Sequence, residues 1–435
     1  MTARRVAITG VGLVSPTGDG FDAFADAIVH GVSAASEIRA FDASPFPTRF
    51  AAQVAPEEMS RARGHRLARP FVDVDDLKSA WGVLAAERAI ADSGWSSVKH
   101  APERSAVILG TGLSSLVKTE LEEDFLPWLD EGGDFDLARY GSEISRRARP
   151  PRSPARHLTD GANRAIAHLA GTSGASLSHF GACAASTQAI GDAYRRVRDR
   201  RADAAICGGM DSMIHPFGMI SFFRLGALSS RNDDMANACR PFQSARDGFL
   251  MGEGAAMLVL EPLDAAKARG ARIFAEIVGY GSSADGYNVT APRPDGAGAA
   301  AAMRGALRDA RLAPEAIGYV NAHGTGTGLN DPAEARAVRE VFGAHAARLP
   351  ISSVKPVLGH TIAAAGAFEV AACLAAIARD RIPPTSSLTS LDAVDAECRG
   401  LDHVLQGGRA GCPDLLMTNN YGFGGQNASL ILQRL

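Results

Sequence analysis

The sequence is poor in cysteine, in aromatic residues and in net charge, and each shortage excludes a class of protein. Its 435 residues contain six cysteines and no Cys-x-x-Cys pair. This argues against a zinc ribbon, a dithiol oxidoreductase and a disulfide scaffold. We therefore expect reduced thiols and a cytoplasmic location. The six are Cys183, Cys207, Cys239, Cys373, Cys398 and Cys412.

A formal net charge of −3 offers no basic surface overall, so nucleic acid is not an expected partner. The opening stretch "MTARRVAITG" has too few apolar residues for a signal peptide. The most apolar run, residues 361–378, carries Glu369 at its centre. We expect a buried core helix there rather than a membrane span.

Short apolar strands alternate with helical segments along the chain, which predicts an α/β protein built of packed layers. Helical spacing covers residues 77–93, and residues 104–115 read as a strand followed by a glycine turn. Gly10 and Gly12 lack the third glycine of a dinucleotide-binding loop, so we interpret them as a tight turn after a strand. Residues 125–157 are irregular and resemble an insertion.

One cysteine stands in "SHFGACAASTQAIGDAYRRVRDR", residues 178–200, where an apolar entry leads into a helix. At a helix start, exposed N–H groups and the helix dipole favour thiolate over thiol. Cys183 is therefore a candidate nucleophile, and an inert buried thiol is the alternative. His323 occupies a similar position in the second half of the chain, near a helix start after a strand.

His323 precedes alternating glycines and threonines in "NAHGTGTGLND". Glycines let the backbone approach a ligand closely, and the hydroxyls of Thr325 and Thr327 can donate or accept hydrogen bonds. A second histidine, His360, directly precedes an alanine-rich helix in "VKPVLGHTIAAAG". A helix dipole keeps such an imidazole neutral, able to donate a hydrogen bond to a developing oxyanion. A satisfied core histidine is the alternative for His323.

Lys355 precedes His360 in apolar surroundings, and an ordinary surface lysine is the alternative. The loop "NNYGFGGQNAS" places three glycines around Phe423, so it can turn a backbone N–H toward a substrate oxygen or form a plain β-turn. Together the residues describe acyl transfer through a thioester on cysteine, with histidines and backbone amides holding the negative oxygens. We expect no metal.

The motifs "GACAAS", "AHGTGTGLND", "VKPVLGH" and "YGFGGQNAS" resemble, in sequence and in order, those of elongating β-ketoacyl-ACP synthases. The resemblance spans nearly the whole chain. It implies a thiolase-like, layered αβαβα fold built from two similar halves. Residues 1–265 would carry the nucleophile, and residues 266–435 would carry both histidines.

The resemblance also implies roles for single residues. Cys183 would be the acyl nucleophile. His323 and His360 would polarise the malonyl thioester carbonyl and stabilise the enolate formed when CO₂ leaves. Lys355 would support the histidines through a carboxylate such as Glu334.

By the same resemblance, the backbone N–H groups of Cys183 and Phe423 would form the oxyanion hole, and the Phe423 ring would act as a gate. Thr325 and Thr327 would hydrogen-bond the phosphopantetheine arm. Leu113 would line the acyl pocket, or belong to ordinary core packing.

The implied reaction condenses malonyl-ACP with the acyl group on Cys183 and gives 3-oxoacyl-ACP extended by two carbons, in fatty acid or type II polyketide biosynthesis. No resident cofactor is expected, because phosphopantetheine arrives on the acyl carrier protein. Candidate docking arginines lie in residues 60–69 and at Arg224 and Arg231. A homodimer is expected, and a heterodimer with a chain-length-factor-like subunit is the alternative.

Several positions depart from the family pattern, including Ala185 and Ser186, which stand where threonine and glycine are frequent after the nucleophile. Pro356 stands where a small hydroxyl residue is common, Tyr421 where phenylalanine is common, and Gln426 where threonine is common. These changes leave the chemistry intact and the substrate open. A CoA thiolase would need a second catalytic cysteine in the C-terminal motif, which has none. A non-catalytic chain-length partner subunit would lack the nucleophile that Cys183 supplies.

Overall fold

The computed structural model describes residues 3–97, 100–112, 126–143 and 158–435. Its largest sheet has eleven strands in the order β12-β10-β9-β14-β15-β8-β1-β7-β6-β4-β5. These strands are β1 (Val6–Val14), β4 (Ser105–Thr111), β5 (Ser176–His179), β6 (Ala204–Asp211), β7 (Gly254–Pro262), β8 (Ala275–Ala284), β9 (Tyr319–Asn321), β10 (Pro350–Ser352), β12 (Asp402–His403), β14 (Leu415–Gly422) and β15 (Gln426–Gln433).

Two smaller sheets accompany the large one. They pair β2 (Ala35–Glu37) with β3 (Phe50–Ala52) and β11 (Arg381–Ile382) with β13 (Arg409–Ala410). The helices are α1 (Gly20–His30), α2 (Pro56–Gly64), α3 (Arg69–Val72), α4 (Leu77–Ser93), α6 (Leu137–Glu143), α7 (Gly161–Ala170), α8 (Ala185–Arg198), α9 (Pro216–Arg224), α10 (Leu263–Ala268), α11 (Ala297–Ala310), α12 (Asn330–Phe342), α13 (Lys355–Leu358) and α14 (Ala365–Arg379).

The large sheet repeats one pattern on either side of the contact between β1 and β8. On one side, β1, β7 and β6 are antiparallel neighbours, and β6, β4 and β5 run parallel. On the other side, β8, β15 and β14 are antiparallel, and β14, β9 and β10 run parallel. The two similar halves of the expected fold are therefore confirmed, while the division between residues 265 and 266 stays a prediction.

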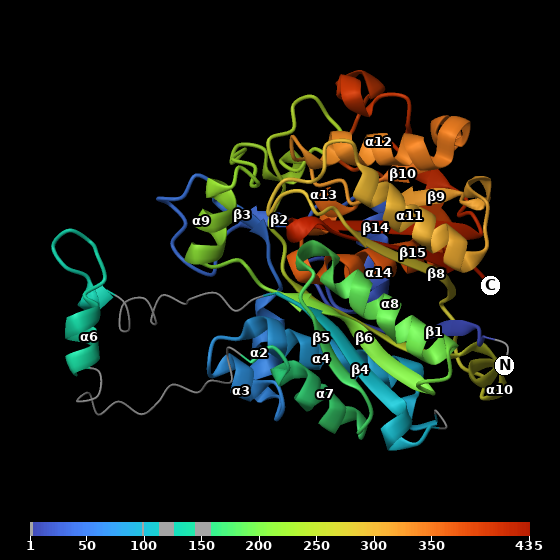
Figure 1. Ribbon diagram of the computed structural model, residues 1–435, viewed down its shortest axis with the longest axis horizontal. Helices are drawn as coiled ribbons and strands as arrows, with labels where there is room; N and C mark the ends of the chain where they lie inside the picture. The colour runs from blue at the N-terminus through green and yellow to red at the C-terminus, as the bar shows by residue number, and fades with distance from the viewer. Residues whose placement is uncertain (1–2, 98–99, 113–125, 144–157) are drawn as a thin grey trace.

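Three helix layers alternate with the two halves of the sheet (Figure 1). Helix α4 packs on β1, β7 and β6, and α7 beside it packs on β4 and β5. Helices α8 and α14 contact each other between the halves, and α11, with α12 beside it, packs on β8 and β15. This arrangement is an αβαβα stack, so the predicted α/β layered fold is confirmed.

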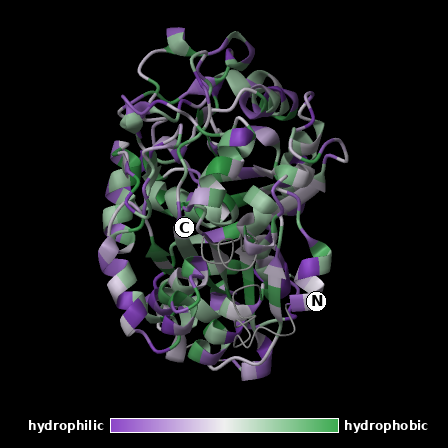
Figure 2. Cartoon of the chain, turned by 90° about the vertical axis from the view of Figure 1, so that its left-hand side faces the viewer, coloured by the Kyte–Doolittle hydropathy of each residue, from purple (hydrophilic) through white to green (hydrophobic). Residues whose placement is uncertain are grey.

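Helix α14 of the inner layer is rich in alanine and is buried along most of its length. Every residue of α14 from Ala365 to Ala376 is buried. Within the described residues, the segment Ile362–Arg379 is long and apolar enough to span a membrane, but 83% of it is buried inside the protein. It is the core helix expected from the sequence. Figure 2 shows the same division, with hydrophilic residues gathered on the outer helices and loops.

Gly10 and Gly12 lie inside β1, not in a turn after it, so the sequence interpretation of this pair was wrong. A Cβ atom on Gly12 would lie 1.9 Å from the carbonyl oxygen of Ala85 in α4. In the second half, a Cβ on Gly281 of β8 would lie 2.1 Å from the carbonyl oxygen of Ala302 in α11. Both pairs of layers depend on glycine to let a helix backbone approach a strand.

We expect Gly12→Ala to destabilise the protein by about 2 kcal/mol, because the added methyl group forces α4 away from β1. Thermal and chemical unfolding measure the effect. Gly64→Ala is the matched control, since a Cβ there meets no atom within 4 Å. Equal stability of the two variants would contradict the close approach of α4 to β1.

Candidate active site

Cys183 lies at a sharp turn between β5 and α8. Ala182 before it has a positive φ of 45°, an uncommon backbone conformation for a residue with a side chain. A short 3₁₀ turn (Ala182–Ala184) then leads into α8. This turn places the Cys183 thiol at the N-terminal end of the central helix, where the side chain is only 6% exposed.

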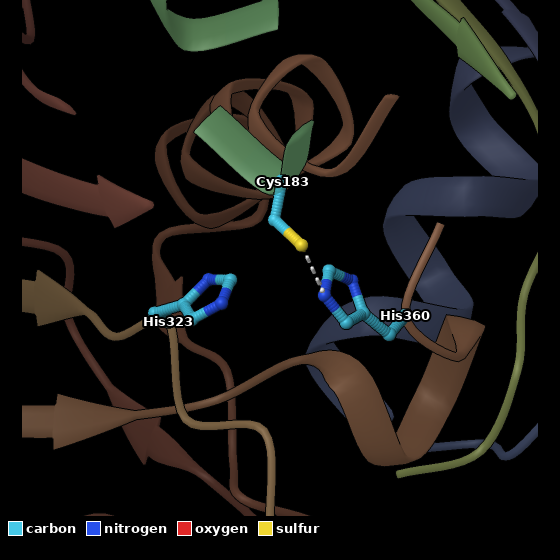
Figure 3. Close-up of side chains that lie close together, drawn as sticks. All are labelled: Cys183, His323 and His360. Carbon is cyan, nitrogen blue, oxygen red and sulfur yellow. Dashed lines mark hydrogen bonds between the residues drawn. The ribbon is translucent and has the colours of Figure 1, made fainter. Parts of the chain in front are cut away.

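His360 faces the thiol across the inner layer (Figure 3). Its Nε2 lies 3.1 Å from the Cys183 Sγ. On the other side of the ring, the backbone N–H of Ile362 donates to Nδ1 at 3.3 Å. Because Nδ1 accepts, the neutral ring carries its proton on Nε2, the nitrogen that points to the sulfur.

His323 completes the group from the end of β9. The ring centroids of His323 and His360 are 5.3 Å apart. The Lys355 ammonium donates to His323 Nδ1 at 3.3 Å and also to the His323 carbonyl oxygen. The proton of the neutral His323 ring is therefore also on Nε2. Burial and the Lys355 charge lower the pKa of both imidazoles well below the ordinary value, so both rings stay neutral N–H donors.

Lys355 is itself buried and forms an ion pair with Glu369 of α14, whose other oxygen accepts from the Asn420 amide at 2.6 Å. The expected partner was Glu334, and this pairing was wrong. Glu334 instead accepts the backbone N–H groups of His323 and Gly324, at 2.9 and 2.8 Å. It therefore holds the histidine loop by its backbone, while Glu369 neutralises the lysine.

The loop after His323 is fixed by a second buried carboxylate. Asp331, in the first turn of α12, accepts the backbone N–H groups of Thr325 and Gly326. The hydroxyls of Thr325 and Thr327 lie 2.8 Å apart. The loop thus presents two hydroxyls side by side at the pocket.

The C-terminal loop approaches Cys183 from the opposite wall. The Phe423 backbone N–H lies near enough to the Cys183 sulfur to lower the pKa of the thiol. Gly422 lies so close that a Cβ on it would be 2.9 Å from the Cys183 backbone nitrogen. The Phe423 ring stacks on Phe222 with centroids 6.2 Å apart. One backbone N–H and one aromatic ring of this loop therefore lie at the thiol.

These groups line one pocket with a volume of about 170 Å³. Leu113 lies outside the described residues. The pocket brings together most of the predicted site, namely Cys183, His323, Thr325, Thr327, His360 and Phe423, and places Lys355 and Glu334 behind its wall.

Burial raises the pKa of the Cys183 thiol to about 12, against the opposing effects of the Lys355 charge and the Phe423 N–H. The thiolate expected from the helix start is therefore not the resting form. Removal of the sulfur from water outweighs the groups that favour its charge.

Cys183, His323 and His360 also have ligand atoms within 4.8 Å of one another, a spacing that suits a metal ion. A metal would need a thiolate and free imidazole lone pairs. The Lys355 ammonium, which donates to His323, opposes a bound cation beside it. The electrostatics therefore favour acyl chemistry over metal binding.

Comparison with known proteins decides the family. Residues 3–266 match the model for the β-ketoacyl synthase N-terminal domain, and residues 274–389 match that for the C-terminal domain. The chain belongs to the β-ketoacyl synthase family. Both domains of the family carry part of the pocket, since Cys183 lies in the first match and both histidines lie in the second.

Its curated relatives fall into two groups. A 3-oxoacyl-[acyl-carrier-protein] synthase 2 of Synechocystis sp. is 36% identical, covering 99% of this chain and 98% of the relative. One of Coxiella burnetii is 37% identical over the whole of both chains. A Streptomyces cyaneus protein assigned as a polyketide β-ketoacyl synthase is also 37% identical, covering 99% of this chain and 98% of the relative.

Solved structures show the same fold over the full chain. A chain of the ishigamide ketosynthase/chain length factor matches with a TM-score of 0.83 and 32% identity, covering 100% of both chains. A β-ketoacyl synthase from Burkholderia phymatum matches with a TM-score of 0.82 and 32% identity, covering 99% of this chain and 100% of that one. A third match is a chain from the complex of a type II polyketide acyl-carrier protein with its ketosynthase, bound to the hexaketide. Its TM-score is 0.83 and its sequence identity 29%, covering 100% of both chains.

Sequence reasoning missed two carboxylates that organise the site of this β-ketoacyl synthase. Glu369 was taken only as evidence against a membrane span, although a lone carboxylate in a buried apolar helix requires a positive partner. Asp331 opens α12 after the glycine-rich loop, where an acidic residue can accept backbone N–H groups.

We expect the alkylation rate of Cys183 to rise about tenfold for each pH unit between pH 6 and 9, because a thiol with a pKa of about 12 forms more thiolate throughout that range. Reaction with iodoacetamide, followed by intact mass, measures the rate. Cys183→Ala supplies the background from the other cysteines. A plateau below pH 8 would show that the thiolate already forms in the free enzyme.

We expect Glu369→Gln to destabilise the protein by about 3 kcal/mol, because it leaves the buried Lys355 ammonium without its carboxylate. The double variant Lys355→Met with Glu369→Gln removes both charges and should recover most of this loss. Chemical unfolding of the three proteins measures it. A double variant that is no more stable than the single one would contradict the pairing.

Proposed function

We propose that this β-ketoacyl synthase catalyses the decarboxylative condensation of malonyl-ACP with an acyl group held on Cys183. The observation that carries the proposal is the convergence of one thiol and two neutral imidazoles in a single buried pocket. The thiol supplies a covalent acyl carrier, and the two imidazoles supply N–H donors for an oxyanion.

In the first step, the Cys183 sulfur attacks the thioester carbonyl of an acyl-ACP. The carbon–sulfur bond to the carrier breaks, and the proton of the Cys183 thiol goes to the leaving carrier thiolate. The backbone N–H groups of Cys183 and Phe423 stabilise the tetrahedral oxyanion. The His360 Nε2–H, 3.1 Å from the sulfur, stabilises the thiolate as it forms.

In the second step, malonyl-ACP replaces the free carrier, and the Nε2–H groups of His323 and His360 hydrogen-bond its thioester carbonyl. The bond to the carboxylate breaks, CO₂ leaves, and the electron pair forms an enolate. The lowered pKa values keep both imidazoles neutral, so they stabilise the enolate oxygen as N–H donors and hold no imidazolium proton to transfer to it.

In the third step, the enolate carbon attacks the Cys183 thioester. A carbon–carbon bond forms, the Cys183 sulfur leaves as a thiolate and takes up a proton from solvent, and a 3-oxoacyl-ACP two carbons longer is released. Loss of CO₂ supplies the carbanion, so the pocket needs no strong base.

The carrier supplies the phosphopantetheine arm, and we propose no resident cofactor. Thr325 and Thr327 present their hydroxyls to this polar arm at the pocket. Among the candidate docking arginines, Arg224 is exposed and precedes Leu225, which lines the pocket, so we propose it for the acidic carrier.

The relatives fit the same chemistry in fatty acid and in type II polyketide biosynthesis. We propose a homodimer, or a heterodimer with a chain-length-factor-like subunit, since related ketosynthases are solved with such partners. We also propose a cytoplasmic location. The support is the absence of disulfides among the six cysteines, all of which are free.

We expect Cys183→Ala to take no acyl group from acyl-ACP and still to decarboxylate malonyl-ACP. His323→Ala should accept the acyl group at the normal rate and His360→Ala more slowly, and both should lose decarboxylation by at least about 100-fold, because each loses an oxyanion donor. Intact mass measures acylation, and CO₂ release measures decarboxylation.

Cys207→Ala is the matched control, since Cys207 is an equally buried thiol in β6, outside the pocket lining. It should be acylated like the wild type. If no acyl-ACP labels the wild-type protein, even with a candidate partner subunit present, the condensing function is wrong at its first step.

A further inference from the structure

The hydroxyl of Tyr421 is buried and has no hydrogen-bond partner among the described residues. Tyr421 lies near the end of β14, and its side chain is 8% exposed. Its ring meets that of His323 edge-on, with centroids 5.6 Å apart. A buried hydroxyl without a partner costs about 1–3 kcal/mol, so its position calls for a ligand.

A small cavity of about 10 Å³ lies against Tyr421, beside the catalytic pocket. It is walled by the segment after β8 and by β14, β15 and α12. Its polar lining includes Asp285, Asn330, Glu334 and Asn427. This volume holds one water molecule, and a buried water needs two to four polar partners. The cavity therefore has the size and the lining of a single-water site.

Several of the groups around the cavity are already committed to other bonds. Asn427, directly opposite Tyr421 in the sheet, donates to Asp285 Oδ1 at 2.7 Å. The other Asp285 oxygen accepts the Arg293 backbone N–H at 2.9 Å. Glu334 is the acidic group whose charge acts most strongly on the Tyr421 hydroxyl.

We propose that Tyr421 is a positioning residue, whose hydroxyl, through one water in this cavity, hydrogen-bonds the Glu334 carboxylate and so holds the His323 loop in its working geometry. The inference rests on the proposed function, because it assigns Tyr421 to the decarboxylation step. Phenylalanine at this position would keep the ring against His323 and lose the link to Glu334.

The water-mediated hydrogen bond from Tyr421 changes the pKa of Glu334. Burial raises the pKa of Glu334 to about 7. A donated hydrogen bond favours the ionised carboxylate, which holds the backbone N–H groups of His323 and Gly324 most strongly. Loss of the Tyr421 hydroxyl therefore raises the Glu334 pKa further. The charged and titratable groups that face the pair from the surrounding elements are Asp285, Arg293, His323, Asp331, Lys355 and Glu369.

The test compares Tyr421→Phe with the wild type in malonyl-ACP decarboxylation across pH 5.5 to 9. We expect the acid limb of kcat to move up by about one pH unit, with KM for malonyl-ACP unchanged. Near pH 6 this is about a tenfold lower kcat, near pH 8 it is about twofold, and toward pH 9 the two enzymes become equal. In the Glu334→Gln background, Tyr421→Phe should have no further effect on the pH profile.

Tyr319→Phe is the matched control, because Tyr319 is a fully buried tyrosine of the neighbouring β9 whose hydroxyl lies 2.8 Å from the Ser352 hydroxyl, away from the pocket. It should lower stability and leave the pH profile unchanged. An equal loss of kcat at every pH in Tyr421→Phe would overturn the proposal. So would a shift that persists when Glu334 is glutamine.

High-resolution crystal structures separate this inference from the proposed function. The wild type should show an ordered water within hydrogen-bond distance of the Tyr421 hydroxyl and the Glu334 carboxylate, and Tyr421→Phe should lose it. A dry cavity in the wild type overturns the inference even if the enzyme condenses malonyl-ACP. A bound water in a protein that takes no acyl group would overturn only the condensing function.

Discussion

One buried ammonium group sets the geometry of the whole active site. Lys355 has three N–H donors, and removing its charge from water is costly unless each donor finds an acceptor. Glu369 accepts one, while the ring nitrogen and the carbonyl oxygen of His323 accept the others. The orientation and the proton position of His323 therefore follow from an ion pair formed behind it.

The layered fold makes such a site possible because it brings both halves of the chain to the N-terminal ends of two central helices. Cys183 belongs to one half and His360 to the other, yet their reacting atoms are 3.1 Å apart. The same burial keeps the imidazoles neutral and the resting thiol protonated. Charge then develops in this pocket only during the reaction, where fixed N–H donors stabilise it without having to reorganise.

The sequence allowed the layer pattern to be predicted, and it singled out Cys183, His323 and His360, which the structure brings into one pocket, because each lies in a motif with its own local signal. The partner of Lys355 could not be predicted, since Glu334 and Glu369 both suit a lysine and only the packing of α14 decides between them. The role of Gly12 was misread because a glycine in a strand resembles a turn until the neighbouring helix is known. The state of Cys183 depended on burial, which opposes the helix dipole and has no signature in the motif.

The strained turn before Cys183 has a structural counterpart before α14, in the second half of the chain. Ile362 has a positive φ of 47°, and like Ala182 it opens a 3₁₀ turn that leads into a central helix. The residue after it is Ala363, which carries no reactive group. Strain of this kind is therefore a property of the repeated architecture and does not by itself mark a nucleophile. The two turns have different roles. The first positions the Cys183 sulfur. In the second, the Ile362 N–H donates to His360 Nδ1, which leaves the proton of that ring on Nε2.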